Sequence, residues 1–299
     1  MAYPLTEKFT KLIREKKLFF LVDSIMMLEK DFGNEFYEYS EKLLALSQRM
    51  NGNPLESITL FTLKYLREQA VFKSTGRYTN NDFDVICKNV YNNVSVMEGY
   101  YLEGLMLTYA FWYLPFLTQR HFISKFLPKV ERCSYGCEFG FGHGLYLLQI
   151  LEGASESKAV GLDISPSAVK YTTRLLNASN IKSNRYSLKM SDVRDCSPFD
   201  NGELDWAVMT EVVEHLPEPL YALKEMARCL KQSGIAFIST VIDSNHIDHI
   251  YNFKCPQEII NMLKEADLRV IHSVECPTSK YIKGSYDKTN RLSFICERC

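Results

Sequence analysis

The chain has 299 residues, which is enough for one large domain or for a core domain with a smaller second one. Its 35 Lys and Arg residues nearly cancel its 36 Asp and Glu residues, and the resulting charge of −1 argues against a nucleic-acid partner, which usually requires a basic excess. Hydrophobic residues make up 46% of the chain, which is ample for a globular core.

Neither a secretory signal nor a membrane span is indicated. The first residues mix charged and apolar side chains without a continuous apolar run. The most apolar stretch, residues 105–117, is shorter than a bilayer span and contains Pro115. The nine cysteines are scattered in a way that is typical of free thiols in a reducing compartment. We therefore expect a cytoplasmic protein without a membrane partner.

Up to about residue 130 the spacing of apolar residues predicts helices only. One predicted helix has its apolar face along residues 36–47, and another spans residues 55–72 behind the capping pair Asn53-Pro54. Asp82 is expected to cap a further short helix. These segments predict a helical domain over residues 1–130 that covers a substrate and offers a surface for a homodimer.

The segment 99–117 contains the highest density of aromatic residues in the chain. It is predicted to form a core helix. Because ligand pockets favour aromatic walls with a polar tip, Tyr109, Trp112 and Tyr113 are also candidates for substrate binding.

From residue 135 onward short apolar strands alternate with helices. The predicted strands are residues 135–139, 159–164, 186–192, 204–210, 235–241, 269–275 and 292–296. The predicted helices between them are residues 144–152, 167–178, 220–230 and 256–266. This alternation predicts an α/β domain over residues 131–299, in which helices cover both faces of a seven-stranded, mostly parallel sheet. Only the turn-rich stretch 277–290 joins the last two strands, so that pair is expected to be antiparallel.

A glycine loop follows the first predicted strand. Residues 138–144 read Glu-Phe-Gly-Phe-Gly-His-Gly, and a predicted helix comes next. Glycines in this place let the chain turn tightly and let a ligand approach the backbone. A dinucleotide-binding loop would have its third glycine at position 145, which is occupied by Leu145.

Glycines at every second position behind an acidic residue resemble the first motif of class I S-adenosylmethionine-dependent methyltransferases, of the small-molecule type with an N-terminal helical domain. Later segments resemble the family's other motifs in order, ending in a Leu-Lys-Gln-Ser-Gly turn at residues 230–234 where Pro-Gly-Gly is usual. The resemblance implies S-adenosylmethionine as the cofactor and the strand order 3-2-1-4-5-7-6 with the last strand antiparallel. It also implies a set of cofactor contacts: Glu138, Gly140, Gly142, Gly144, Asp163, Ile164, Asp192, Val193 and Glu211. Within this set, Asp163 would bind the ribose, and Asp192 and Val193 would contact the adenine.

The fourth strand is followed by Glu211, Glu214 and His215, which would share one face of a helical turn. Two carboxylates and an imidazole suit a divalent metal ion, and metal-using members of the family carry a similar segment. Examples are the ubiquinone-pathway O-methyltransferases and the enzymes that methylate the terminal 2′-hydroxyl of small RNAs. In the absence of a metal, His215 is the predicted general base, and Glu211 and His249 are further catalytic candidates. His246 is expected to contact the substrate.

The sequence thus predicts an enzyme of biosynthesis, expected in secondary metabolism, that methylates O, N or C of a small molecule. Three alternatives stay open: a metal-assisted methyltransferase of RNA 3′ ends, a non-catalytic methyltransferase-like scaffold, and an NAD-dependent oxidoreductase.

Overall fold

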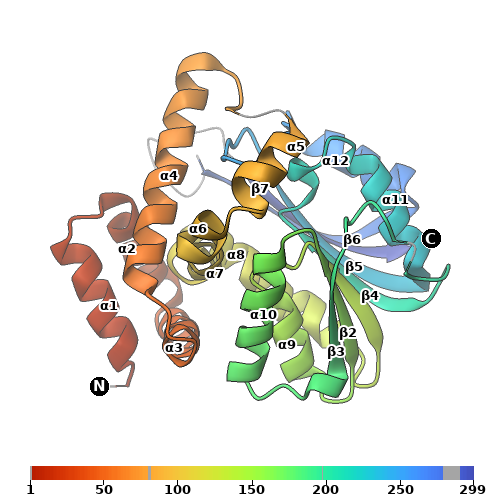
Figure 1. Cartoon of the computed structure of the whole chain (residues 1–299), viewed down its shortest axis with the longest axis horizontal. Coiled ribbons are helices and arrows are strands. Elements are labelled where there is room, and N and C mark those ends of the chain that lie inside the picture. The colour runs from red at the N-terminus through yellow and green to blue at the C-terminus, as the bar shows by residue number, and fades with distance from the viewer. Residues whose placement is uncertain (1, 80–81, 197, 279–289) are drawn as a thin grey trace.

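The computed structural model describes residues 2–79, 82–196, 198–278 and 290–299. Helices make up the N-terminal part, and a sheet with flanking helices makes up the rest, as Figure 1 shows. The N-terminal helices are α1 (Pro4–Glu15), α2 (Phe19–Phe32), α3 (Asn34–Arg49), α4 (Pro54–Thr75), α5 (Phe83–Ile86), α6 (Val94–Val96), α7 (Leu102–Phe111) and α8 (Tyr113–His121). Tighter or wider turns join them: η1 (Cys87–Tyr91), η2 (Met97–Tyr101), η3 (Phe122–Phe126) and η4 (Leu127–Lys129).

The capping signals predicted from the sequence for two helices, α4 and α5, are confirmed in part. The Asp82 carboxylate accepts hydrogen bonds from the backbone N–H groups of Asp84 and Val85, which confirms the predicted cap of α5. Pro54 stands in the first turn of α4 as expected. The Asn53 side chain does not cap that helix; its amide donates to Glu56 Oε2 at 2.5 Å instead.

The aromatic segment 99–117 is not one continuous helix. The wide turn η2 leads into α7, the chain then leaves helical geometry at Trp112 (ψ 132°), and α8 begins at Tyr113. Pro115 explains the break, because it lacks a backbone N–H and its ring would clash with the carbonyl of Phe111 in an unbroken helix.

The sheet has the predicted order, β3-β2-β1-β4-β5-β7-β6. Its strands are β1 (Tyr135–Phe139), β2 (Lys158–Asp163), β3 (Tyr186–Met190), β4 (Leu204–Thr210), β5 (Leu230–Ile242), β6 (Leu268–Pro277) and β7 (Asn290–Arg298). The pairs from β3 to β5 are parallel, and β7 runs antiparallel to both β5 and β6. The fold prediction is therefore confirmed. Of the stretch predicted as turn-rich, residues 279–289 lie outside the described residues.

Helices cover both faces of the sheet, as predicted. They are α9 (Leu145–Gly153), α10 (Pro166–Ala178), α11 (Pro219–Cys229) and α12 (Pro256–Glu265), with the short turns η5 (Ser183–Arg185) and η6 (Val213–His215). Successive strand residues face opposite sides. Trp206 and Val208 of β4 accordingly pack in one core with α9, α10 and the N-terminal helices, whereas Ala207 and Met209 pack in a second core with α11 and α12.

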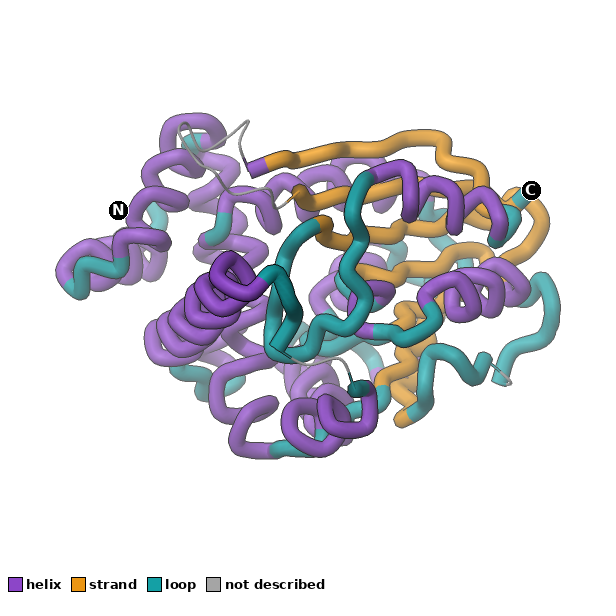
Figure 2. Tube along the Cα trace, turned by 90° about the horizontal axis from the view of Figure 1, so that it is seen from above, coloured by secondary structure: helices purple, strands orange, loops and turns teal. Residues whose placement is uncertain are grey.

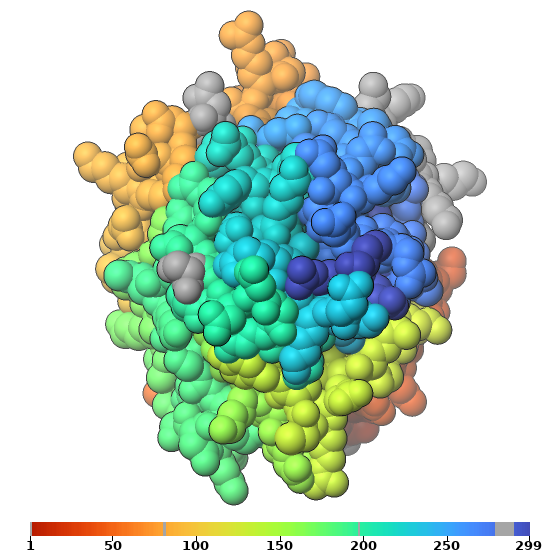
Figure 3. Space-filling model, turned by 90° about the vertical axis from the view of Figure 1, so that its right-hand side faces the viewer, coloured from red at the N-terminus to blue at the C-terminus, as the bar shows by residue number. Residues whose placement is uncertain are grey.

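The N-terminal helices therefore share a core with one face of the sheet. Figure 2 shows them gathered beside the strands, and in Figure 3, which shows the right-hand side of the view in Figure 1, most of what is seen of them lies toward the rim. Among the described residues, no helix combines the length and the apolar character needed to cross a bilayer.

Candidate active site

One large cavity lies between the strand ends of the sheet and the N-terminal helices. Its empty space, including the open mouth, is about 1220 Å³. Twelve of the residues predicted from the sequence line it: Tyr109, Trp112, Gly140, Gly142, Asp163, Ile164, Asp192, Val193, Glu211, His215, His246 and His249.

The glycine loop forms one wall of the cavity. Gly140, Gly142 and Gly144 all have φ between +47° and +70°, the left-handed region that favours glycine. A Cβ on Gly142 would meet nothing within 4 Å, so this glycine leaves open space on the cavity side. A Cβ on Gly144 would lie 2.3 Å from Thr172 Cγ2, because the loop packs closely on α10.

Two predicted cofactor residues of this motif support the loop from behind. Gly144 and Glu138 do not line the cavity. The Glu138 side chain is 1% exposed, and its Oε2 accepts a hydrogen bond from the backbone N–H of Leu147 at 2.8 Å, in the first turn of α9. Burial raises the pKa of Glu138 well above its usual value. The Glu138 carboxylate thus contacts α9, the helix that follows the loop.

Asp163, at the end of β2, faces the same cavity. Its Oδ2 accepts from Gly142 N and its Oδ1 from Ser165 N, both at 2.8 Å, so the carboxylate ties β2 to the glycine loop. Burial raises the pKa of Asp163 to about 6, although the two backbone donors favour the ionised form. The group is thus predominantly ionised at neutral pH and can accept hydrogen bonds from a ligand hydroxyl.

Asp192 and Val193 lie at the far end of the cavity, after β3. The Asp192 carboxylate pairs with Arg194 Nη2 at 2.7 Å, and the Arg194 guanidinium stacks 4.6 Å from the ring centre of Phe83. Burial opposes ionisation of Asp192, but hydrogen bonds from Arg194 hold its pKa below the usual value. Val193 and Phe83 both line the cavity and provide apolar walls there.

Glu211 stands just beyond β4 and is held differently from the prediction. Its Oε1 accepts from Ser239 Oγ at 2.7 Å, and its Oε2 pairs with Arg291 Nη2 at 3.1 Å. Its φ is +52°, and only residues 213–215 form a 3₁₀ turn, so residues 211–215 do not make the single helical turn that the sequence indicated. Glu211 therefore faces Arg291, away from a ligand set with Glu214 and His215.

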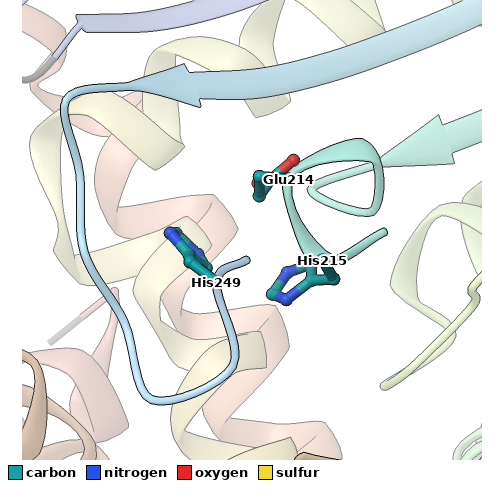
Figure 4. A group of neighbouring side chains, drawn as sticks. All are labelled: Glu214, His215 and His249. Atoms are coloured by element: carbon teal, nitrogen blue, oxygen red, sulfur yellow. The ribbon is translucent and has the colours of Figure 1, made fainter. Parts of the chain in front are cut away.

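Glu214 and His215 instead meet His249 from the loop after β5 (Figure 4). One potential ligand atom from each of the three lies within 4.8 Å of the others. Glu214 is fully buried; its Oε2 accepts from Thr240 Oγ1 at 2.8 Å, and its Oε1 has no hydrogen-bond partner among the described residues. Burial and nearby Glu211 raise the pKa of Glu214 well above the usual value.

In both histidines of this group, Nδ1 contacts a backbone carbonyl oxygen and Nε2 is the ring nitrogen left for a ligand. His215 Nδ1 lies 2.9 Å from Asp248 O, and His249 Nδ1 lies 2.7 Å from Ser244 O. A carbonyl oxygen can only accept, so both Nδ1 atoms carry the proton and both Nε2 atoms have a free lone pair. This is the arrangement that metal-binding histidines usually have. The donor set Glu214, His215 and His249 therefore fits a divalent cation.

Asp248 organises the neighbouring polar groups. It is fully buried, accepts from His246 Nδ1 at 2.6 Å and from the hydroxyl of Tyr101, and lies 3.4 Å from the Tyr91 hydroxyl. Burial opposes its charge, but the surrounding histidines hold the pKa of Asp248 far below its usual value. His246 Nε2, on the other side of the ring, is buried without a partner in the described part of the chain.

Aromatic rings from the N-terminal helices close the cavity. The Trp112 ring centre lies 4.8 Å from that of Tyr65 and 5.8 Å from that of Phe61, and Phe61 stacks on His246 at 5.2 Å. Tyr113, the third aromatic residue predicted for substrate binding, does not line the cavity. The break at Trp112 turns it toward α2, where its hydroxyl donates to Asp31 Oδ2 at 2.7 Å.

The sequence analysis did not single out several cavity residues. They include Arg291, Asp248, Tyr91, Tyr101, Phe61 and Phe83. For Arg291 a signal existed: in an antiparallel last strand, the first residues lie at the sheet edge that carries the glycine loop, and an arginine there precedes an apolar run. Asp248 stood between two histidines that were already candidates.

Comparisons with known proteins agree with this geometry. Residues 137–238 match the family model for the methyltransferase domain. A ubiquinone biosynthesis O-methyltransferase of Xanthomonas campestris pv. campestris (strain B100) is 23% identical over 163 residues, or 48% of this chain, and the match spans 64% of that relative's length.

Two solved structures have similar folds at low sequence identity. Geranyl diphosphate C-methyltransferase from Streptomyces coelicolor A3(2), solved with Mg²⁺, geranyl diphosphate and S-adenosyl-L-homocysteine, has a TM-score of 0.52 at 13% identity, covering 70% of this chain and 89% of that one. The [4+2]-cyclase SpnF has a TM-score of 0.51 at 13% identity, covering 61% of this chain and 79% of that one. The second example shows that this fold does not by itself fix the reaction.

The strand order, the glycine loop and the acidic strand ends define a Rossmann-like methyltransferase domain. The sheet half of this chain thus has the fold of class I S-adenosylmethionine-dependent methyltransferases, and its residues 137–238 match the methyltransferase domain model.

Proposed function

We propose that this chain transfers the methyl group of S-adenosylmethionine to a small molecule held under its N-terminal helices. One observation carries the proposal: the glycine loop with Asp163 and the aromatic wall around Trp112 line the same cavity. The sulfonium carbon of the cofactor is already electrophilic, so the protein's task is to hold a nucleophile in line with it and to exclude water.

The cofactor would lie along the strand ends from β3 toward β4. Asp163 would accept hydrogen bonds from the ribose hydroxyls, and Val193 and Phe83 would enclose the adenine. Gly142 offers the open backbone surface that a bound nucleoside requires.

Several features favour a small acceptor. Two fully buried polar atoms of the aromatic wall, Trp112 Nε1 and His246 Nε2, lack partners among the described residues, which suits a compact molecule with one or two polar groups. The near-neutral charge offers little attraction for an RNA backbone. Similarity to a ubiquinone biosynthesis O-methyltransferase supports a hydroxyl as the methylated group.

Calorimetric titration with S-adenosylhomocysteine tests the cofactor assignment. The wild-type chain should bind it, and Asp163→Asn should weaken binding about 10-fold or more because a charged acceptor is lost. Asp23→Asn, an exposed change on α2, is the matched control. Absence of binding to the wild-type chain would refute the proposed function, whereas unchanged binding to Asp163→Asn would refute only the role of that residue.

We also propose that Glu214, His215 and His249 hold a divalent cation next to the acceptor. Support comes from the unpartnered Glu214 Oε1 and from the two free Nε2 atoms. A bound ion would supply a Lewis acid that lowers the pKa of an acceptor hydroxyl. In a metal-free site, His215 Nε2 is the proposed general base and His249 an alternative. Glu211 is not proposed as a metal ligand.

Titration with Zn²⁺ and Mn²⁺ tests the cation site directly, because it needs no substrate. His249→Ala should weaken binding of the ion about 10-fold or more. His272→Gln, which changes a histidine outside the cavity, is the control. If wild type and His249→Ala bind both ions equally, the site is wrong.

A further inference from the structure

The outward face of α4 presents apolar side chains to solvent. Leu63 is 52% exposed, Leu66 38% and Val71 36%. Together with Ala70, which is also exposed, they follow the spacing i, i+3, i+7 and i+8 and therefore share one face of the helix. Exposed apolar side chains that are grouped in this way are typical of a contact surface.

The charged side chains on and beside this face are basic. Residues 63–77 contain one acidic residue, Glu68, which is 8% exposed and accepts a hydrogen bond from the Thr79 hydroxyl. The basic residues of the same stretch are all exposed: Lys64, Arg67, Lys73 and Arg77. Because the whole chain has a net charge of only −1, this end of α4 concentrates positive charge. Apolar side chains interspersed with Lys and Arg are typical of helices that lie on an anionic lipid surface.

The start of α2 adds side chains of the same two kinds. The ring centre of Phe20 lies 6.2 Å from that of Tyr65, which places this end of α2 beside α4. The neighbouring Phe19 is 71% exposed, the largest exposed fraction among the large apolar side chains of the described residues. Lys16 and Lys17 precede it and are exposed.

The shape of this region favours a flat partner. Figure 1 shows the C-terminal end of α4 projecting beyond the neighbouring elements. Leu63, Leu66 and Val71 do not line the cavity. A peptide helix usually binds in an apolar groove, whereas a projecting helix face can insert its side chains into the boundary between lipid headgroups and acyl chains.

Two other occupants fit the outward face of α4 less well. In a symmetric dimer the same surface faces itself, so Lys64 and Arg67 would lie opposite their own copies, and like charges placed together are unfavourable. Single-stranded RNA binds to aromatic side chains on which its bases stack, whereas the exposed apolar side chains of α4 are aliphatic.

We propose that the outward face of α4 binds the surface of an anionic lipid bilayer. Leu63, Leu66 and Val71 insert at the level of the headgroups, and the basic side chains contact lipid phosphates. Such binding is peripheral. It therefore differs from the sequence prediction of no membrane partner, which rested on the lack of an apolar span.

The opposite face of α4 gives this contact a place relative to the cavity. Phe61 and Tyr65 line the cavity from that face. The bound bilayer would thus lie about 10 Å, the diameter of one helix, from the aromatic wall. The inference goes beyond the proposed function and does not depend on it, because a lipid surface is bound with or without methyl transfer.

Sedimentation of the full chain with lipid vesicles tests the inference. Wild type should bind vesicles of phosphatidylcholine with about 30% phosphatidylglycerol about 10-fold more tightly than vesicles of phosphatidylcholine alone, and added salt should reduce the difference. The double variant Leu63→Gln/Leu66→Gln should weaken binding to the anionic vesicles about 10-fold, because apolar area no longer inserts. Lys64→Gln/Arg67→Gln should weaken it about 10-fold through the loss of charge.

Matched controls remove exposed side chains near β3, which lies far from α4 in Figure 1. Met190→Gln changes an apolar side chain that is 66% exposed, and Lys182→Gln/Lys189→Gln changes two exposed lysines. Both controls should bind vesicles as wild type does. Because all replaced side chains are at least partly exposed, urea denaturation should show that every variant folds.

Several outcomes would overturn the inference. One is wild-type binding that does not depend on phosphatidylglycerol, and another is wild-type affinity for anionic vesicles in either α4 double variant. If L63Q/L66Q instead dissociates a wild-type dimer and leaves vesicle binding unchanged, the surface belongs to a second copy of the chain. If K64Q/R67Q abolishes binding of single-stranded RNA and leaves vesicle binding unchanged, the surface belongs to a nucleic acid.

Discussion

The two halves of the molecule contribute to the cavity in different ways. The sheet half places backbone loops and carboxylates at regular strand ends, where Gly142 and Asp163 meet through a 2.8 Å hydrogen bond. The helical half contributes rings such as Trp112 and hydroxyls such as that of Tyr101 from helices interrupted by wide turns and a proline. In the proposed function, the cofactor would thus be bound by regular strand ends, whereas the wall facing the acceptor would be built from irregular helical segments.

Different interactions also stabilise the two halves. Strand pairing stabilises the sheet half, while the helical half shares an apolar core with one face of the sheet and is also tied to it by polar side chains. Gln69 of α4 donates to Ser244 Oγ at 3.1 Å and to Asn245 O at 2.8 Å, in the loop after β5. Ser165, at the start of α10, donates to Tyr91 O at 2.6 Å. The experiments below change the sheet half, the helical half and the contact between them separately.

The largest effect is expected in the glycine loop, from Gly144→Ala. The new Cβ would overlap Thr172 at 2.3 Å while φ stays at +70°, so both a clash and backbone strain arise. We expect a loss of about 3 kcal/mol in the free energy of unfolding, measured by urea denaturation. Gly142→Ala meets open space and should lose only about 1 kcal/mol, yet weaken cofactor binding because the methyl group intrudes on the cavity. Equal destabilisation by both changes would contradict this account.

In the helical half, Glu103→Gln should have the next largest effect. The Glu103 carboxylate is 8% exposed and accepts from Ser47 Oγ at 2.5 Å, Ser57 Oγ at 2.6 Å and Asn53 N at 3.0 Å, which joins α3, α4 and α7. An amide would present a donor to one of these donors, so we expect a loss of about 2 to 3 kcal/mol. Urea denaturation measures it, with Glu15→Gln on the surface of α1 as the control. A loss no larger than that of the control would show that the network does not stabilise this half.

The contact between the halves should depend on pH through His121 of α8. Its Nε2 lies 2.9 Å from His272 Nδ1, and its Nδ1 lies 2.7 Å from Ser293 Oγ. Burial lowers the pKa of His121 to about 4 from the usual 6.5. Between these values the unfolded chain binds more protons than the folded one, so stability is retained above the unfolded pKa and falls as the pH decreases through this window.

At about pH 5 this residue should account for about 2 kcal/mol of lost stability relative to neutral pH. His121→Gln should remove that part of the pH dependence, as measured by denaturation at both pH values. An unchanged difference between the two pH values in the variant would contradict the assignment.

The same contrast between the halves explains how far the sequence could predict the structure. Asp163 and the glycine loop were predictable because local spacing and strand ends determine their place. Arg291 was missed because its contact with Glu211 joins segments 80 residues apart in the chain. Local spacing could not show that Tyr113 lies outside the cavity, because that depends on the break in helical geometry at Trp112 and on a contact with Asp31 of α2.

The smallest predicted effect has the opposite sign and tests the first residues of β5, where the pairing with β4 shifts its register; the sequence had indicated a turn here. Ser233 has φ +61° and is exposed, in a position where the family usually has glycine. A side chain in this conformation costs about 1 kcal/mol, which glycine avoids at the expense of greater freedom in the unfolded chain. Ser233→Gly should therefore stabilise the protein by about 0.5 kcal/mol in urea denaturation. Gln232→Gly, one residue earlier and without a positive φ, should destabilise it, so stabilisation by both changes would show that the backbone conformation of Ser233 is not the cause.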